Sequence, residues 1–138
     1  MTAPEARVAC AVARAEGRVL VVRRDAGPLG PGWGLPCIEL EGRQTPDAAL
    51  APVLEGLLGA PCATTWPLDD VDGTAGERSV RLACVAFEAP RGTRPQDTDD
   101  LRWVAPEDLL DVDWSPLERE LVMRLAMGWS EIFSENRF

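Results

Sequence analysis

The chain has 138 residues, of which 46% are hydrophobic and 27% charged, and these proportions fit one globular domain. No apolar stretch approaches the roughly 18 to 20 residues that cross a bilayer, and the first residues lack the pattern of a secretory signal, so we expect a cytoplasmic protein. The net charge of -9 repels phosphate groups, which makes nucleic acid and anionic membranes poor expected partners.

The residue types that are absent narrow the chemistry further. The sequence has no histidine, which excludes Ser-His-Asp triads, Cys-His pairs, zinc-histidine sites and a histidine general base. The 4 cysteines, Cys10, Cys37, Cys62 and Cys84, stand singly without a C-x-x-C spacing, so we expect buried free thiols. Any chemistry must then come from carboxylates, arginine, a thiol, hydroxyls, backbone groups or a bound metal.

The first third of the chain predicts a hairpin and then a loop. Residues 7–14 and 18–23 are Val-rich runs separated by a segment with Gly17, which is typical of two antiparallel strands. Residues 25–34 are rich in Gly and Pro, a composition that disfavours both helix and ladder pairing, so we expect a loop.

A helix is predicted from Pro46 to the residue before Gly59. Thr45 is placed to accept a hydrogen bond from a first-turn N–H group, and proline at the first helical position loses no bond. Apolar residues then follow at helical spacing, and they are Leu50, Val53, Leu54, Leu57 and Leu58. Pro52 conflicts with this pattern, because proline inside a helix removes a hydrogen bond, and we expect a kink or a late start there.

The second half predicts further strands and a terminal helix. Residues 61–77 are expected to be mostly turns, with one short strand at most and a turn at 69–73. Residues 79–88 predict a central strand covered on both faces. The remaining expectations are a loop at 90–100, a short strand at 101–104, a helical turn at 106–110 and a helix from 115 to about 127.

The terminal helix is predicted to begin with a capping box and to end at Gly128. In this box Ser115 accepts from one free N–H group and Glu118 reaches back to another. The order of elements predicts an α/β fold with a mixed sheet sandwiched between helices, an α/β/α arrangement, in a single domain spanning residues 1–138. Large apolar residues in the tail, residues 129–138, suggest that it covers a pocket or forms a homodimer contact, which deletion of the tail would test.

Several segments of the sequence share the pattern of a known family. They are the hairpin that ends in Arg23-Arg24, the run Gly32-Trp-Gly-Leu-Pro36, the helix that closes at Gly59 and the run Leu101-Arg-Trp-Val-Ala-Pro-Glu-Asp-Leu109. In these segments the chain resembles the Nudix hydrolases, in particular the MutT-like nucleotide pyrophosphohydrolases. The resemblance covers nearly the whole chain. It implies the Nudix fold and a Mg²⁺-dependent diphosphate hydrolase.

The residues that carry the chemistry in this family are replaced here. The family box reads Gly-x5-Glu-x7-Arg-Glu-x2-Glu-Glu-x-Gly, and only its last glycine, Gly59, is present. The other positions hold Ile38, Gln44, Pro52-Val53 and Gly56-Leu57. In the family the helix carboxylates bind Mg²⁺, a cation that needs hard oxygen ligands. Because Val53 and Leu57 cannot donate to a cation, we expect no metal site and an apolar patch in its place.

The same frame indicates candidate ligand-binding residues. Arg23 and Arg24 end the second predicted strand, where MutT-like proteins direct a basic residue toward substrate phosphate. Strand alternation lets only one of the two face the pocket, and for each of them a surface position is the open alternative. Arg23 is the one included among the candidates. Trp33 can stack on an aromatic ligand or belong to the core. Cys37 replaces the first glycine of the family's Pro-Gly-Gly turn. The remaining candidate ligand-binding residues are Gln44, Val53 and Leu57, which stand at positions of the family box.

Three classes of function remain open on this basis. The first is a binding protein without hydrolytic activity, for a small molecule or a protein partner. The second is a metal-free enzyme acting on a biosynthetic intermediate, with Glu39 or Glu41 as a weak candidate for a general acid or base. The third is a residual nucleoside-diphosphate-type hydrolase, and in this case alone Mg²⁺ would be a cofactor.

Overall fold

The structure is a computed structural model that describes residues 4–127 and, within this range, the side chains of all residues except 64–66, 69 and 127. The predicted helix stop at Gly128 and the apolar tail at residues 129–138 lie outside the described residues. The elements are β1 (Ala6–Ala15), β2 (Arg18–Arg24), β3 (Gly32–Gly34), β4 (Cys37–Glu39), α1 (Pro46–Leu58), β5 (Ala63–Ala75), β6 (Arg78–Glu88), β7 (Leu101–Val104), the 3₁₀ helix η1 (Pro106–Asp111) and α2 (Pro116–Met127).

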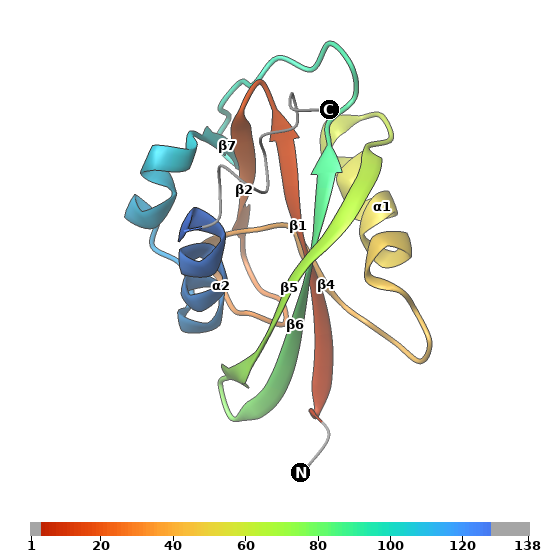
Figure 1. Cartoon of the computed structure of the whole chain (residues 1–138), viewed down its shortest axis with the longest axis vertical. Helices are drawn as coiled ribbons and strands as arrows, with labels where there is room; N and C mark the ends of the chain where they lie inside the picture. Colours follow the sequence, from red (N-terminus) through yellow and green to blue (C-terminus); the bar gives the residue numbers. More distant parts are fainter. Residues whose placement is uncertain (1–3, 128–138) are drawn as a thin grey trace.

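One mixed sheet joins all strands of the described part of the chain. Its main path runs β3-β2-β1-β6-β5, with β4 paired to β1 and β7 paired to β2. The pairing of β1 with β6 is parallel, and the other pairings are antiparallel. Helix α1 covers one face of this sheet, whereas η1 and α2 lie on the other (Figure 1). The predicted α/β/α arrangement is therefore confirmed.

The strand predictions were right at the hairpin and wrong in two places. β1 and β2 form the expected antiparallel pair, and β6 lies between β1 and β5 as a central strand. Residues 63–75 were expected to be mostly turns. They form the long edge strand β5 instead, because the backbone groups at the free edge of β6 pair with them in an antiparallel ladder. Its register shifts around Pro67, as an edge strand tolerates. Residues 32–34, expected to be loop, pair with β2 as the short strand β3.

Helix α1 has the predicted bounds, Pro46–Leu58, and Pro52 lies inside it without delaying its start. Gly59 ends the helix in the left-handed conformation, with φ of 78°, and its N–H donates to the Glu55 carbonyl oxygen at 2.8 Å. The predicted Thr45 side-chain cap is wrong, because its hydroxyl makes no cap hydrogen bond. The first turn is largely exposed, so its free N–H groups are open to solvent.

Helix α2 confirms the predicted buried stripe, which consists of Leu117, Leu121, Val122 and Leu125. The predicted capping box forms only in part. The Glu118 backbone N–H donates to the Ser115 hydroxyl oxygen at 3.4 Å, but the Glu118 carboxylate points into the protein and is fully buried.

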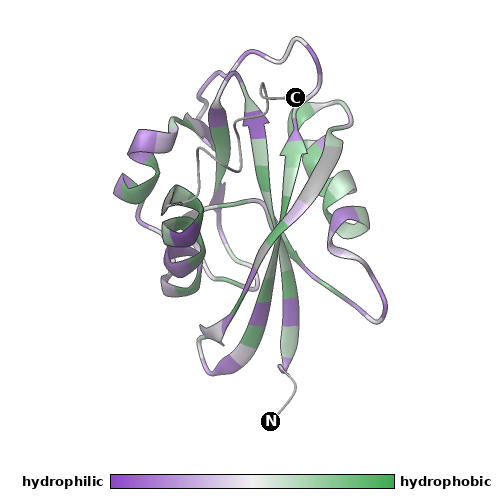
Figure 2. Ribbon diagram, viewed as in Figure 1, coloured by the Kyte–Doolittle hydropathy of each residue, from purple (hydrophilic) through white to green (hydrophobic). Residues whose placement is uncertain are grey.

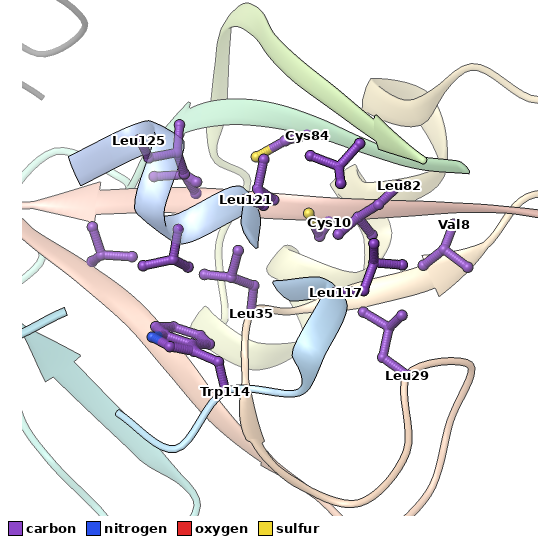
Figure 3. Packing of buried hydrophobic residues seen from close by; sticks show 14 of the residues in the cluster. Val8, Cys10, Leu29, Leu35, Leu82, Cys84, Trp114, Leu117, Leu121 and Leu125 are labelled. Atoms are coloured by element: carbon purple, nitrogen blue, oxygen red, sulfur yellow. The ribbon is translucent and has the colours of Figure 1, made fainter. Parts of the chain in front are cut away.

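Two apolar cores lie on the two faces of the sheet. The core under α2 contains Val8, Cys10, Leu82, Cys84 and the α2 stripe, and Leu35 and Trp114 pack among them (Figure 3). The core under α1 contains alternate residues of the same strands together with Leu50, Leu54 and Phe87. Figure 2 shows green, hydrophobic segments along the central strands, alternating with paler and purple ones. Among residues 4–127, no helix has the length and apolar character needed to span a membrane.

Candidate functional site

A pocket of about 210 Å³ lies where α1 meets the ends of β2, β4 and β7, and we call it the α1 pocket. Its walls are mainly apolar, and the apolar side chains that line it are Val22, Ala26, Pro28, Pro36, Val53, Leu57 and Leu101. Polar groups come from Arg23, Arg24, Cys37 and Asp100. An apolar concavity with a few polar groups at its edge is the usual form of a small-molecule site.

Helix α1 places Val53 and Leu57 in this pocket through its own periodicity. Both side chains are half-buried, and they stand one helical turn apart on the same side of the helix. The fully buried side chains Ala49, Leu50 and Leu54 instead anchor α1 to the sheet. Val53 and Leu57 are therefore held at the margin of the core, where they remain accessible from the pocket.

Arg23 and Asp100 form an ion pair at the rim. The Arg23 Nη2 donates to Asp100 Oδ1 at 2.6 Å, and the two side chains are 51% and 68% exposed. The Arg23 backbone N–H also donates to the Asp100 carbonyl oxygen at 2.9 Å. The charge of Asp100 is thus compensated, and the Arg23 guanidinium has further N–H donors besides the Nη2 group bound to Asp100.

Arg24 forms a second, buried ion pair with Glu118 of α2. Arg24 Nη2 and Nη1 donate to the two carboxylate oxygens at 2.7 and 3.0 Å, and the two side chains are only 8% and 0% exposed. The Leu35 backbone N–H donates to the same carboxylate at 2.9 Å, and the Ser115 hydroxyl donates at 2.8 Å. Arg24 Nε has no hydrogen-bond partner among the described residues. This network ties the pocket wall to α2.

Both arginines line the pocket, which corrects the expectation that strand alternation would bring only one of them there. They reach it differently, because Arg23 stands at the exposed rim whereas the Arg24 guanidinium turns inward to Glu118. These residues lie at the end of β2, opposite the short strand β3, and not in the middle of a long ladder.

Cys37 joins the pocket to the Arg24 network. The Arg24 Nη1 lies 3.7 Å from the Cys37 sulfur. Burial raises the pKa of the Cys37 thiol above its ordinary value, and the positive charge of Arg24 opposes that rise without cancelling it. The thiol is therefore mainly protonated near neutral pH.

Trp33 lies outside the α1 pocket. Its ring stacks under the Arg102 guanidinium, with 4.1 Å between the guanidinium carbon and the ring centroid. It lines a different cavity of about 410 Å³ on the η1 side and packs against the core under α2. Trp33 thus combines a core contact with a cation–π contact.

No family model matches the chain, and no curated protein matches it in sequence. Solved structures do match it. A MutT NUDIX hydrolase from Burkholderia pseudomallei is 22% identical with a TM-score of 0.67, over 87% of this chain and 97% of that chain. The MutT protein from Methanosarcina mazei Go1 is 18% identical with a TM-score of 0.68, over 92% and 96%. The C-terminal domain of mouse MUTYH, solved with human PCNA, is 22% identical with a TM-score of 0.69, over 92% and 90%.

The chain has the Nudix fold. Val53 and Leu57, which the resemblance in the sequence would align with glutamates of the Nudix box, both line the α1 pocket. Among the described lining residues Asp100 is the only carboxylate, and it is paired with Arg23. A hard divalent cation needs several clustered oxygen ligands, so these residues do not fit the Mg²⁺ that the Nudix resemblance implies.

The other sequence candidates do not line the α1 pocket. Glu39 forms an ion pair with Arg78 at 2.9 Å, and the hydrogen bond from Arg78 holds the pKa of this exposed carboxyl below its ordinary value. Glu41 is exposed in the loop before α1, and its backbone N–H donates to the Gln44 side-chain oxygen at 2.8 Å. Gln44 therefore stabilises the turn of that loop.

Glu118 is the residue of this region that sequence reasoning missed, since it was assigned only to a helix cap. A signal was present, because Glu118 precedes Val122 by one helical turn and Leu125 by two, on the stripe predicted to be buried. A carboxylate on such a stripe needs a buried cationic partner. The sequence has 14 arginines, and nothing in it indicates that Arg24 is the partner of Glu118.

Proposed function

We propose that this Nudix-fold chain acts by binding, without metal-dependent hydrolysis, and that its ligand is a small apolar molecule with one anionic group. The observation that carries the proposal is that the apolar side chains of Val53 and Leu57 line the α1 pocket. The Nudix resemblance aligns these two positions with glutamates of the family box. Apolar side chains favour apolar ligand surface and provide no ligand for a cation.

The arginine at the rim of the α1 pocket favours a ligand with a negative charge. Arg23 uses one guanidinium nitrogen on Asp100, so its remaining donors can bind a ligand carboxylate or a similar anion. Arg24 adds positive charge to the wall but is held by Glu118, so it contributes less. The volume of about 210 Å³ lies below the range of about 300 to 1,000 Å³ of drug-sized pockets, which favours a small metabolite.

A protein partner is the second candidate within the binding class. It is favoured by one comparison, because the C-terminal domain of mouse MUTYH was solved in a complex with human PCNA. The metal-free enzyme is less well supported. A general acid must reach its substrate in the protonated form, whereas Glu39 is paired with Arg78, has a lowered pKa and does not line the pocket.

The ligand class can be tested with hexanoate, hexanol and hexylamine, which share a chain length and differ in charge. Amide chemical shifts of the folded protein, followed by NMR at low ionic strength, report both affinity and location. We expect hexanoate to bind most tightly and hexylamine least, with shifts concentrated at α1 and the end of β2. Equal binding of the three, no binding, or shifts centred on other elements would contradict the proposal.

Matched variants separate the pocket from general surface effects. Leu57→Glu should abolish hexanoate binding, and Arg23→Gln should weaken hexanoate while leaving hexanol unchanged. Leu110→Glu is the control for the first, because Leu110 is 47% exposed and does not line the pocket. Arg124→Gln is the control for the second, because Arg124 is 48% exposed and pairs with Glu120 much as Arg23 pairs with Asp100. Both controls should bind like the parent chain.

A further inference from the structure

Three of the cysteines stand side by side across adjacent strands. In the sheet register, Cys10 of β1 is opposite Cys37 of β4 on one side and opposite Cys84 of β6 on the other. Cys10 and Cys84 belong to the core under α2, and Cys37 packs against that core, so the three side chains lie on one face of the sheet. Figure 3 shows the sulfurs of Cys10 and Cys84 among the leucines beneath α2.

The β1–β4 pairing brings Cys10 and Cys37 closer than an average cross-strand pair. The Ala11 N–H donates to the Pro36 carbonyl oxygen at 2.9 Å, and the Leu40 N–H donates to the Arg7 carbonyl oxygen at 2.8 Å. These bonds identify the hydrogen-bonded pairs of the ladder, and Cys10 and Cys37 therefore form a non-hydrogen-bonded pair. At such pairs the Cα atoms are about 4.5 Å apart and the side chains are nearest. This spacing lies within the range of disulfides.

The two thiols differ in access. Cys37 is half-buried and lines the α1 pocket, so a small oxidant that enters the pocket meets this residue before any other cysteine. Cys10 is fully buried, and its pKa is raised by a hydrogen bond with the Cys84 thiol and by burial. Cys84 is 1% exposed and lies one strand beyond Cys10, so it faces Cys10 but is not opposite Cys37.

We propose that Cys37 and Cys10 form a redox pair that hydrogen peroxide converts to a disulfide. The Cys37 thiolate attacks one peroxide oxygen, the O–O bond breaks, and the products are Cys37 sulfenic acid and hydroxide. The Cys10 sulfur then attacks the sulfenic sulfur, the S–O bond breaks, and the Cys10 proton leaves with that oxygen as water. Two thiols lose two electrons in total, and the peroxide is reduced to water.

This chemistry adds a modification site to the wall of the α1 pocket. It concerns the thiols themselves and stands whether or not the pocket binds the proposed anion. Arg24, 3.7 Å from the Cys37 sulfur, provides the positive charge that favours the attacking thiolate, although burial keeps the thiolate fraction low. We therefore expect a slow reaction that is specific for this pair.

The sequence makes a direct test possible. Cleavage after arginine gives separate peptides for each cysteine, with Cys10 in residues 8–14, Cys37 in 25–43, Cys62 in 44–78 and Cys84 in 82–91. The folded, reduced chain is exposed to hydrogen peroxide, remaining thiols are blocked, and the peptides are identified by mass spectrometry without reduction. We expect the 8–14 peptide linked to the 25–43 peptide. A link between other peptides, or oxygen adducts without a link, would overturn the proposal.

Cys62 provides the matched control. It is half-buried, and burial raises its thiol pKa as at Cys37, but it packs against the core under α1, on the other face of the sheet. Cys62→Ser should form the 8–14 to 25–43 link at the parent rate, and Cys10→Ala should lose the link and accumulate oxygen adducts on Cys37. If Cys10→Ala does not fold, the peptide map of the parent chain still decides the question.

Discussion

Arg24 at the end of β2 and Glu118 in α2 form a two-bond ion pair, with N–O distances of 2.7 and 3.0 Å, although they are 94 positions apart in the sequence. The pair is nearly closed to solvent, with side-chain exposures of 8% and 0%. It joins the wall of the α1 pocket to the opposite layer of the molecule. In the Nudix-fold chain this contact is a direct polar connection between α2 and the candidate site.

Removal of one partner should be costly. Glu118→Ala leaves the Arg24 charge buried and the Leu35 N–H without its acceptor, so we expect the free energy of unfolding to fall by about 3 to 5 kcal/mol. Urea denaturation followed by circular dichroism measures this change. Glu120→Ala is the control, since Glu120 is exposed and pairs with Arg124 on the helix surface, where the loss should stay below about 0.5 kcal/mol. Equal losses in the two variants would contradict the account.

Gly34 is required by the same ion pair. A Cβ atom at position 34 would lie 2.5 Å from the Arg24 Cζ and 2.6 Å from Glu118 Oε2, so Gly34→Ala should lower the free energy of unfolding by about 1 to 3 kcal/mol. At Gly56, on α1, an added Cβ meets nothing within 4 Å, and Gly56→Ala should raise that free energy by about 0.5 to 1 kcal/mol. Opposite signs in the two unfolding curves are expected, and the same sign in both would refute this explanation.

Pro52 should weaken α1. Proline at this interior position cannot donate to the carbonyl of Ala48, and its side chain is exposed, so Pro52→Ala should raise the free energy of unfolding by about 1 to 3 kcal/mol. Thermal unfolding of the parent and the variant provides the comparison. A lower stability in the variant would indicate that the packing of α1 on the sheet depends on a kink at Pro52.

The reactivity of Cys37 should rise at alkaline pH. Burial raises the thiol pKa, so the reactive thiolate is scarce below the ordinary thiol value of about 8.5 and becomes abundant only above it. In the Cys62→Ser variant, the rate of iodoacetamide alkylation at Cys37, followed by peptide mass, should therefore reach half of its maximum above that pH. A midpoint at or below the ordinary value would mean that the Arg24 charge outweighs burial.

Elements with local signals were predictable from the sequence. Helix α1 has the expected bounds because Pro46 and Gly59 act on the backbone next to them, and the α2 stripe follows from its own spacing. Strand β5 was missed because its own residues are typical of turns. It forms through pairing with the free edge of β6, and the local composition gives no sign of that pairing. The Thr45 cap was wrong because a cap residue is a preference, and the exposed first turn does not require it.

The candidate site was predictable only as far as the Nudix resemblance set the register. That frame brought Arg23, Cys37, Val53 and Leu57 to one pocket, as the structure places them. Trp33 and Gln44 lie elsewhere, because Trp33 belongs to strand β3 and lines the other cavity, whereas Gln44 accepts from the Glu41 N–H in the turn before α1. The Arg24–Glu118 pair and the Cys10–Cys37 pair depend on contacts between distant segments, which residue types alone do not specify.

The most direct test of the central claim is a hydrolysis panel. Phosphate and pyrophosphate release is measured from nucleoside triphosphates, nucleotide sugars and dinucleoside diphosphates, with Mg²⁺ or Mn²⁺ and with EDTA, for the parent chain and for Glu41→Gln. We expect no release above the protein-free control under any condition, because Val53 and Leu57 offer no ligand to a metal. Release that EDTA abolishes would contradict this expectation, and loss of that release in Glu41→Gln would locate a metal site in the loop before α1.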